Sequence, residues 1–219
     1  MDLGITGRTA LVLGASGGLG GAIAVRLAKE GVNVAAAGRS SDALAATVAQ
    51  VEAAGPRGLP LVWDLGELDR IEANVAEIEH ALGPIDILVN NTGGPPPTPA
   101  AGQDPETWRH SFESMVVAVI AVTDRVLPGM RERGWGRILT STSSGALTPI
   151  PNLGISNTLR ASLHSWSKTL ADEVGRDGVT ANVIVPGRIA TGRTRFLDER
   201  RADREDRPVE EVARESAAT

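Results

Sequence analysis

The sequence predicts an α/β fold in which a doubly wound parallel sheet lies between two layers of helices, a three-layer αβα sandwich. Short apolar segments alternate with longer amphipathic segments from one end of the chain to the other. The 219 residues are 42% hydrophobic and 22% charged, which fits one globular domain with a full core. We therefore expect a single domain over residues 1–219.

Composition excludes several classes of function. A net charge of −5 argues against a nucleic-acid-binding or anionic membrane-binding surface. The chain has no cysteine, which excludes disulfides, a thiolate nucleophile and a cysteine-type zinc site. No grouping of His, Asp and Glu has metal-ligand spacing, so no metal is expected. Without a secretory signal pattern or a membrane-spanning apolar run, a cytoplasmic protein is expected.

Six strand patterns and five helix patterns account for most of the chain. Strands are predicted at residues 9–13, 33–37, 58–63, 85–89, 136–140 and 180–185. Helices are predicted at residues 18–28, 68–82, 105–133 and 152–175, and through residue 54 from an N-cap at Ser41 or Asp42. The proline-rich residues 95–99 predict a stiff loop. The charged stretch 193–219 predicts an exposed helix or a mobile tail.

A glycine-rich turn joins the first predicted strand to the first predicted helix. Gly14, Gly18 and Gly20 have the spacing G-xxx-G-x-G, which differs from the usual dinucleotide fingerprint. Glycine lets the backbone approach a phosphate closely, and a helix N-terminus offers unpaired N–H groups to it. Such a turn can also serve close packing alone. Its place in a strand–turn–helix unit favours nucleotide binding.

Small, polar or glycine residues follow all six predicted strands. The carboxyl ends of parallel strands meet at one edge of a sheet, where ligands of such folds bind. These residues therefore predict one continuous binding rim, formed by residues 14–20, Arg39, Asp64, residues 90–94, residues 141–144 and residues 186–191.

Together these motifs resemble the short-chain dehydrogenase/reductase family, and within it the β-ketoacyl-carrier-protein reductases. The glycine motif, Asn-Asn-Thr-Gly at 90–93, Gly-Arg-Ile at 136–138 and Val-Pro-Gly at 185–187 with Thr191 carry the resemblance, which covers residues 6–197. It implies a Rossmann-type fold and oxidoreductase activity. Family members usually continue with a helix and a seventh strand, so the last strand of the sheet is expected to be missing.

The resemblance also implies a nicotinamide dinucleotide on the rim. The residues expected to bind it are Gly14, Ser16, Gly17, Gly18, Leu19, Gly20, Arg39, Ser40, Asp64, Leu65, Asn91, Thr92, Gly93, Pro186, Gly187, Ile189 and Thr191. Family members that use NAD carry an acidic residue after the second strand, where this chain has Arg39. A guanidinium can pair with a 2′-phosphate, which favours NADP(H) over NAD(H). Alternatively, Arg39 is an ordinary surface charge and Asp64 an N-cap.

The family's catalytic tetrad is largely replaced. The resemblance places its serine at Ser143, its tyrosine at Ser156, its lysine at Arg160 and its asparagine at Met115. The chain contains no tyrosine at all. Ser156 and Arg160 share one helix face at spacing i,i+4, but neither can readily exchange a proton near neutral pH.

Two roles for the replaced positions remain open. Arg160 either binds the nicotinamide ribose or the substrate carbonyl, or it makes a structural ion pair while Ser156 packs. His164 and Lys168 imitate the spacing of the missing pair, but His164 lies further down the helix, so it is expected to be structural, as are His80 and His110.

The sequence thus favours an NADP(H)-dependent oxidoreductase acting on a carbonyl or alcohol substrate, similar to 3-oxoacyl reductases, with Ser143, Ser156 and Arg160 at the catalytic positions. The alternative is a nucleotide-binding or oligomer-partner protein that retained the scaffold and lost the chemistry. A small-molecule substrate is expected, and a homo-oligomer is compatible with either hypothesis.

Overall fold

Six parallel strands form one sheet in the order β3-β2-β1-β4-β5-β6. The computed structural model describes residues 2–217, so residues 218–219 of the predicted tail lie outside the described residues. The strands are β1 (Thr9–Val12), β2 (Asn33–Gly38), β3 (Gly58–Val62), β4 (Ile87–Asn90), β5 (Gly136–Ser141) and β6 (Val179–Ile184). Strand order reverses between β1 and β4, which places a ligand crevice beyond their carboxyl ends.

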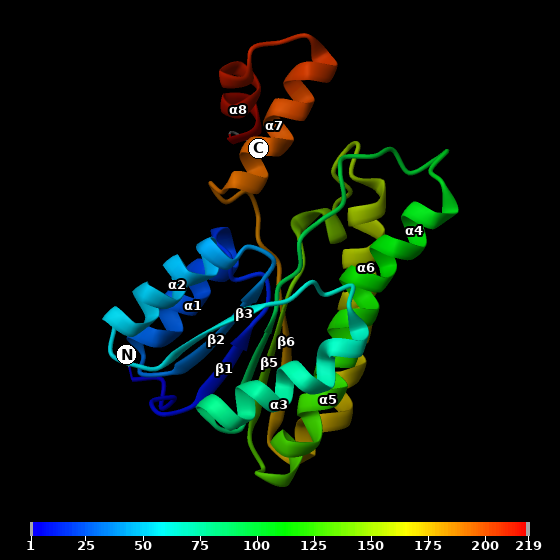
Figure 1. The fold of residues 1–219 in the computed structure, drawn as a ribbon. Coiled ribbons are helices and arrows are strands. Elements are labelled where there is room, and N and C mark those ends of the chain that lie inside the picture. The colour runs from blue at the N-terminus through cyan, green and yellow to red at the C-terminus, as the bar shows by residue number, and fades with distance from the viewer. Residues whose placement is uncertain (1, 218–219) are drawn as a thin grey trace.

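Helices cover both faces of the sheet, which confirms the predicted fold class (Figure 1). One face carries α1 (Gly18–Lys29) and α2 (Ser41–Ala53), and the other carries α3 (Ile71–Leu82), α5 (Ala118–Glu132) and α6 (Gly154–Val174). Helices α4 (Pro105–Phe112), α7 (Gly192–Glu205) and α8 (Val209–Ala217) lie at the end of the sheet where the strands finish. No helix in the described part of the chain is both long and apolar enough to span a membrane.

Alternating side chains of the central strands build two core layers. Leu11 and Leu13 pack into the layer under α3, α5 and α6, whereas Ala10 and Val12 pack into the layer under α1 and α2. A strand buried on both faces needs an uninterrupted apolar sequence, which explains why the first strand was recognisable.

Several predicted boundaries are wrong by one or two residues. The N-cap of α2 is Ser40, whose Oγ accepts from the Ala43 N–H at 3.4 Å, and neither Ser41 nor Asp42. Strand β4 spans 87–90 where 85–89 was predicted, β3 ends at Val62, and β6 spans 179–184. Apolar patterns mark what is buried, but ladder pairing decides where a strand begins and ends.

The helix predicted over 105–133 contains a π-helical segment, Glu113–Val117, between α4 and α5. This segment holds one extra residue in the turn and thereby changes which side chains face the sheet. Met115 and Val116 are buried there, beside α6.

The charged tail forms two helices over its described residues. Thr191 and Thr194 make a capping box at the start of α7, and Val212 of α8 is buried. Arg201 and Arg207 form ion pairs with glutamates of both helices, Glu205, Glu211 and Glu215. The described part of this stretch thus contains the helices Gly192–Glu205 and Val209–Ala217.

Gly20 provides a test of the turn between β1 and α1. A Cβ at Gly20 would lie 2.7 Å from the carbonyl carbon of Gly14, and backbone cannot yield as a side-chain end can. We expect Gly20→Ala to lower the free energy of unfolding by about 3 kcal/mol in urea titrations.

The matched control is Gly21→Ala on the same helix. Its added methyl would lie 3.4 Å from the Ala15 carbonyl oxygen and 3.5 Å from Thr47 Oγ1, which is ordinary contact. Equal stability of the two variants would contradict the role given to Gly20.

Candidate active site

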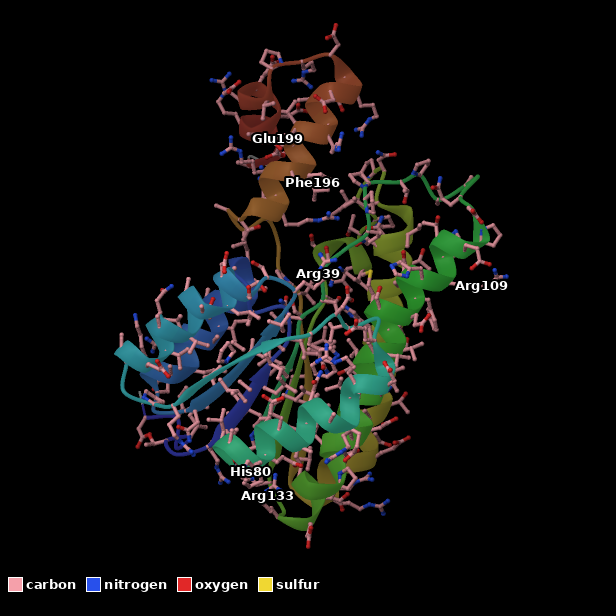
Figure 2. All side chains as sticks on the ribbon, in the orientation of Figure 1. Arg39, His80, Arg109, Arg133, Phe196 and Glu199 are labelled. Atoms are coloured by element: carbon pink, nitrogen blue, oxygen red, sulfur yellow. The ribbon has the colours of Figure 1, made fainter. Side chains whose placement is uncertain are left out.

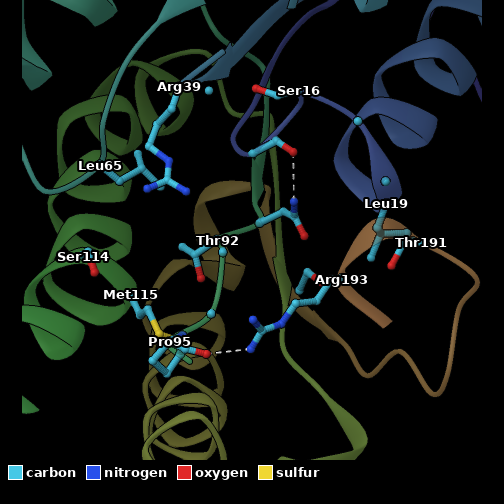
Figure 3. A pocket seen from close by; sticks show the side chains of 18 of the residues that line it. Ser16, Leu19, Arg39, Leu65, Thr92, Pro95, Ser114, Met115, Thr191 and Arg193 are labelled. Atoms are coloured by element: carbon cyan, nitrogen blue, oxygen red, sulfur yellow. Dashed lines mark hydrogen bonds between the residues drawn. The ribbon is translucent and has the colours of Figure 1, made fainter. Parts of the chain in front are cut away.

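A cavity of about 830 Å³ lies beyond the carboxyl ends of the strands. Its walls come from the glycine-rich turn, the segments after β2, β3, β4 and β5, the π-helical segment, and residues 186–194 (Figure 3). Of the residues predicted to bind a cofactor, the cavity is lined by Gly14, Ser16, Gly17, Gly18, Leu19, Arg39, Ser40, Asp64, Leu65, Asn91, Thr92, Gly93, Pro186, Gly187, Ile189 and Thr191. Gly20 is not a lining residue, because it packs against Gly14.

Asn91 holds the glycine-rich turn in place. Its Nδ2 donates to the carbonyl oxygens of Leu13 at 3.3 Å and Gly14 at 3.4 Å. Gly14 has φ +63°, and a Cβ on it would lie 2.7 Å from that same Nδ2. The turn therefore requires glycine, and the Asn91 amide acts on the backbone of the turn.

The amino end of α1 opens onto the cavity without a side-chain cap. Its N-cap is Gly17, and no described side chain accepts a hydrogen bond from its first turn. Gly17 and Gly18 are both exposed and line the cavity. Unpaired N–H groups at a helix N-terminus bind anions, which suits the pyrophosphate of a dinucleotide.

Three buried polar atoms on lining residues have no hydrogen-bond partner among the described residues. They are Ser16 Oγ, Thr92 Oγ1 and Trp63 Nε1. Six further buried polar atoms, on residues that do not line the cavity, also have no hydrogen-bond partner among the described residues, so the three at the wall are compatible with a polar ligand but do not by themselves indicate one. A long, polar dinucleotide fits this wall and the glycine cradle beside it.

Arg39, Ser40 and Asp64 lie at one end of the cavity. Ser40 caps α2, and Asp64 Oδ1 accepts from the Gly66 N–H at 3.0 Å, so both side chains already have local partners. Arg39 is exposed and pairs with none of the described carboxylates. In Figure 3 its guanidinium extends beside Leu65. Arg39 therefore presents a free cation at this end of the cavity.

Arg160 reaches from α6 to three backbone carbonyls. Its Nη1 donates to Ser141 O at 3.2 Å, and its Nη2 donates to Thr92 O at 3.3 Å and Gly93 O at 2.9 Å. Burial, together with the nearby charge of Arg193, lowers the pKa of Arg160 to about 10. The guanidinium stays charged at neutral pH and joins the ends of β4 and β5.

Ser143 and Ser156 do not line the cavity, although Ser141 and Thr142 do. Ser143 Oγ accepts from the Gly145 N–H at 3.1 Å, which leaves its own hydroxyl proton available. Ser156 is 8% exposed within α6. Met115, which the resemblance is expected to align with the family's asparagine, is a lining residue.

His164 contacts the site through Thr142. The hydroxyl of Thr142 donates to Ile184 O at 3.1 Å, and its Oγ1 lies 2.8 Å from His164 Nε2. The Thr142 hydroxyl, which lines the cavity, thus stands between the His164 imidazole and the cavity.

The sequence pattern does not predict part of the cavity wall. His110 was expected to be structural, but it lines the cavity with Thr107, Ser111 and Ser114 from α4 and the π-helical segment. Arg193 of α7 was also missed, because it lies in a stretch assigned to the tail. The π-helical segment turns this part of the helix toward the cavity, and nothing in the periodicity signals it. In Figure 2, His80 lies at the far end of the molecule from Arg39.

Among the described residues, no cluster of His, Asp and Glu is arranged to hold a metal ion.

Comparison with known proteins places the chain in a family. Residues 8–202 match the family model described as short chain dehydrogenase. Ketoacyl reductase HetN of a Nostoc species is 33% identical over 191 residues, which span 87% of this chain and 67% of that protein.

Solved structures give the same result. The crystal structure of L-sorbose reductase from Gluconobacter frateurii, complexed with NADPH and L-sorbose, matches with TM-score 0.87 and 34% identity over 93% of this chain and 78% of that one. A structure of NAD⁺-bound xylitol dehydrogenase matches with TM-score 0.84 and 25% identity over 90% of this chain and 77% of that one.

The chain thus belongs to the short-chain dehydrogenase family, a family of oxidoreductases. This confirms the resemblance to ketoacyl reductases inferred from the motifs.

Arg160 can be tested by its effect on stability. Arg160→Met removes three hydrogen bonds to carbonyl oxygens. The variant also avoids the free-energy cost of burying a charge, but this gain offsets only part of the loss. We expect the free energy of unfolding to fall by about 2 kcal/mol in denaturant titrations. Lys168→Met, on an exposed position of the same helix, is the control and should change it by less than about 0.5 kcal/mol. An unchanged stability of Arg160→Met would show that these bonds contribute nothing.

Proposed function

We propose that this chain is an NADP(H)-dependent oxidoreductase that interconverts a carbonyl compound and an alcohol, similar in substrate type to the 3-oxoacyl reductases. The observation that carries the proposal is the cavity wall, where glycines, unpaired N–H groups and three unsatisfied polar atoms stand at the strand ends of a short-chain dehydrogenase fold. Both NADPH-bound and NAD⁺-bound relatives have this fold.

Arg39 supports NADP(H) within this proposal. It is the unpaired cation at the end of the cavity that holds Ser40 and Asp64. A 2′-phosphate there would accept charge-assisted hydrogen bonds from its guanidinium. An NAD ribose would offer it only hydroxyl groups.

When bound, a nicotinamide cofactor would supply a hydride to the carbonyl carbon. The π electrons of the C=O bond would pass to the oxygen, which would become an alkoxide. Arg160 provides positive charge beside Thr92 and Gly93, away from the end of the cavity that holds Arg39, and this charge favours negative charge on that oxygen.

Ser143 does not line the cavity in this structure, but it directly follows the lining residues Ser141 and Thr142, and we propose that its hydroxyl turns to donate a hydrogen bond to the same oxygen once substrate is bound. Because neither Ser156 nor Arg160 readily releases a proton at neutral pH, the alkoxide takes its proton from water. The cost is a slower reaction, typically by ~10²–10⁴-fold against a positioned general acid.

The alternative hypothesis, a scaffold protein that lost its chemistry, gains no support from the comparisons, in which the matched relatives carry the names of enzymes. The replaced tetrad positions are compatible with slow turnover as well as with none.

Cofactor preference is tested by titrating NADPH and NADH while following energy transfer from tryptophan to nicotinamide. Trp63 lines the cavity, so a bound cofactor should give a strong energy-transfer signal. We expect saturable binding that favours NADPH, and Arg39→Ala should weaken NADPH binding by about 10–100-fold with little effect on NADH.

The control for that titration is Arg26→Ala on α1, an arginine whose side chain pairs with Glu30 outside the cavity. Equal affinities for the two cofactors in the unmodified protein would refute the role of Arg39. Binding of neither cofactor at millimolar concentration would refute the proposed function.

Ser143→Ala tests the proposed contact with the reacting oxygen. Loss of a donor used mainly in the transition state should lower kcat by about 10²-fold while KM changes little. Ser144→Ala is the neighbouring control. If turnover of Ser143→Ala equals that of the unmodified protein, the serine has no such role.

A further inference from the structure

Two arginines from different helices converge on the segment 93–95. Arg160 Nη2 of α6 donates to Gly93 O at 2.9 Å, and Arg193 Nη2 of α7 donates to Pro95 O at 2.7 Å. A Cβ placed on Gly94 would lie 3.7 Å from Arg160 Nη2 and 3.1 Å from Arg193 Nη2. The two guanidinium groups therefore flank one small volume on the cavity wall.

Neither arginine has an acidic partner among the described residues. All the protein acceptors of both guanidinium groups are backbone carbonyl oxygens. The neighbouring arginines of the same region behave differently: Arg188 pairs with Asp198 and Arg195 with Glu199. Two partly buried like charges without a counter-ion are costly unless an anion joins them.

The free-energy cost of burying these charges is expressed in the pKa of both guanidinium groups. Burial lowers the pKa of Arg193, and burial together with the Arg193 charge lowers that of Arg160. An anion between them would oppose both effects. Each guanidinium also keeps N–H groups for it, because Arg193 uses one of its five donors and Arg160 three in the contacts above.

The position of the pair separates it from the cofactor's phosphates. The amino end of α1 faces Thr191, whose Cβ lies 3.7 Å from the position of a Gly18 Cβ. In Figure 3 the Arg193 guanidinium points away from Leu19 and Thr191, toward Pro95 and Met115. Among the described residues, Asp64 is the one acidic residue that lines the cavity, and it lies at the opposite end, beside Arg39 and Leu65.

We propose that Arg160 and Arg193 form a carboxylate subsite, so that the substrates are oxo acids and the matching hydroxy acids. Guanidinium groups bind planar carboxylates with paired hydrogen bonds, which suits this arrangement. The proposal rests on the proposed function for the reaction itself, in which the oxo acid gains a hydride and a proton and NADPH becomes NADP⁺.

The test compares two probes that differ in charge, acetoacetate and its neutral amide, acetoacetamide. The rate of NADPH oxidation gives kcat/KM for each, and the acid-to-amide ratio is the readout. We expect a ratio well above one in the unmodified protein, and a fall of about 10-fold or more in Arg193→Gln. Arg195→Gln, two residues along α7 and exposed, is the matched control and should keep the ratio.

Gly94→Ala is a second variant that leaves both charges in place. Its methyl group would stand against both guanidinium groups, and its backbone has no positive φ to forbid alanine. Gly94→Ala should lower the acid-to-amide ratio as well, so it can replace Arg193→Gln in the test if that variant does not fold.

An acid-to-amide ratio near 1 in the unmodified protein would overturn the proposal, and so would a ratio that stays unchanged in both variants. Either result would leave the oxidoreductase function intact. Weaker NADPH binding in Arg193→Gln without a change in the ratio would assign the arginine to a cofactor phosphate and also overturn it. If neither probe is reduced, the ratio cannot be measured, and calorimetric titration with malonate tests the subsite instead. The proposal then requires that malonate binds and that Arg193→Gln weakens this binding by about 10-fold or more, and any other result overturns it. The proposed function itself is decided by the cofactor titration.

Discussion

The close contact between Gly20 and Gly14 is the constraint on which the site depends. A backbone carbonyl lies where any other residue at position 20 would carry its Cβ, and Asn91 fixes the same turn from β4. This contact sets the distance between β1 and α1, so it places the amino end of α1 at the edge of the sheet. The binding properties of the cavity follow from that placement.

Backbone carbonyls, rather than acidic side chains, hold the arginines at the other end of the cavity. Arg160 links the segments after β4 and β5, while Arg193 links α7 to Pro95. This arrangement orders the proline-rich segment without neutralising either charge. The two guanidinium groups thereby give this part of the cavity a rigid positive potential, which can stabilise negative charge on a bound group.

The sequence predicts the fold and most of the cavity wall formed by the strand ends, because strand ends of a parallel sheet must meet and the glycine spacing is local. It does not predict the part of the wall that comes from helices. His110 and Ser114 line the cavity from α4 and the π-helical segment, and Arg193 lines it from α7. The positions of these helices depend on tertiary packing, which the hydrophobic periodicity of the sequence does not indicate. Ser143 was located by the family motif, yet its neighbours Ser141 and Thr142 line the cavity.

The π-helical segment Glu113–Val117 has a consequence for how this fold changes over time. It lies between α4, which forms one wall of the cavity, and α5, which packs into the core. One residue of an α-helix corresponds to a rotation of about 100°. Loss of a single residue from this segment would thus turn α4 and present new side chains to the cavity, while α5 kept its register against the sheet. The wall of the cavity can therefore change by a length change in one helix, with the repacking centred on the cluster that Met115 and Val116 form with α6.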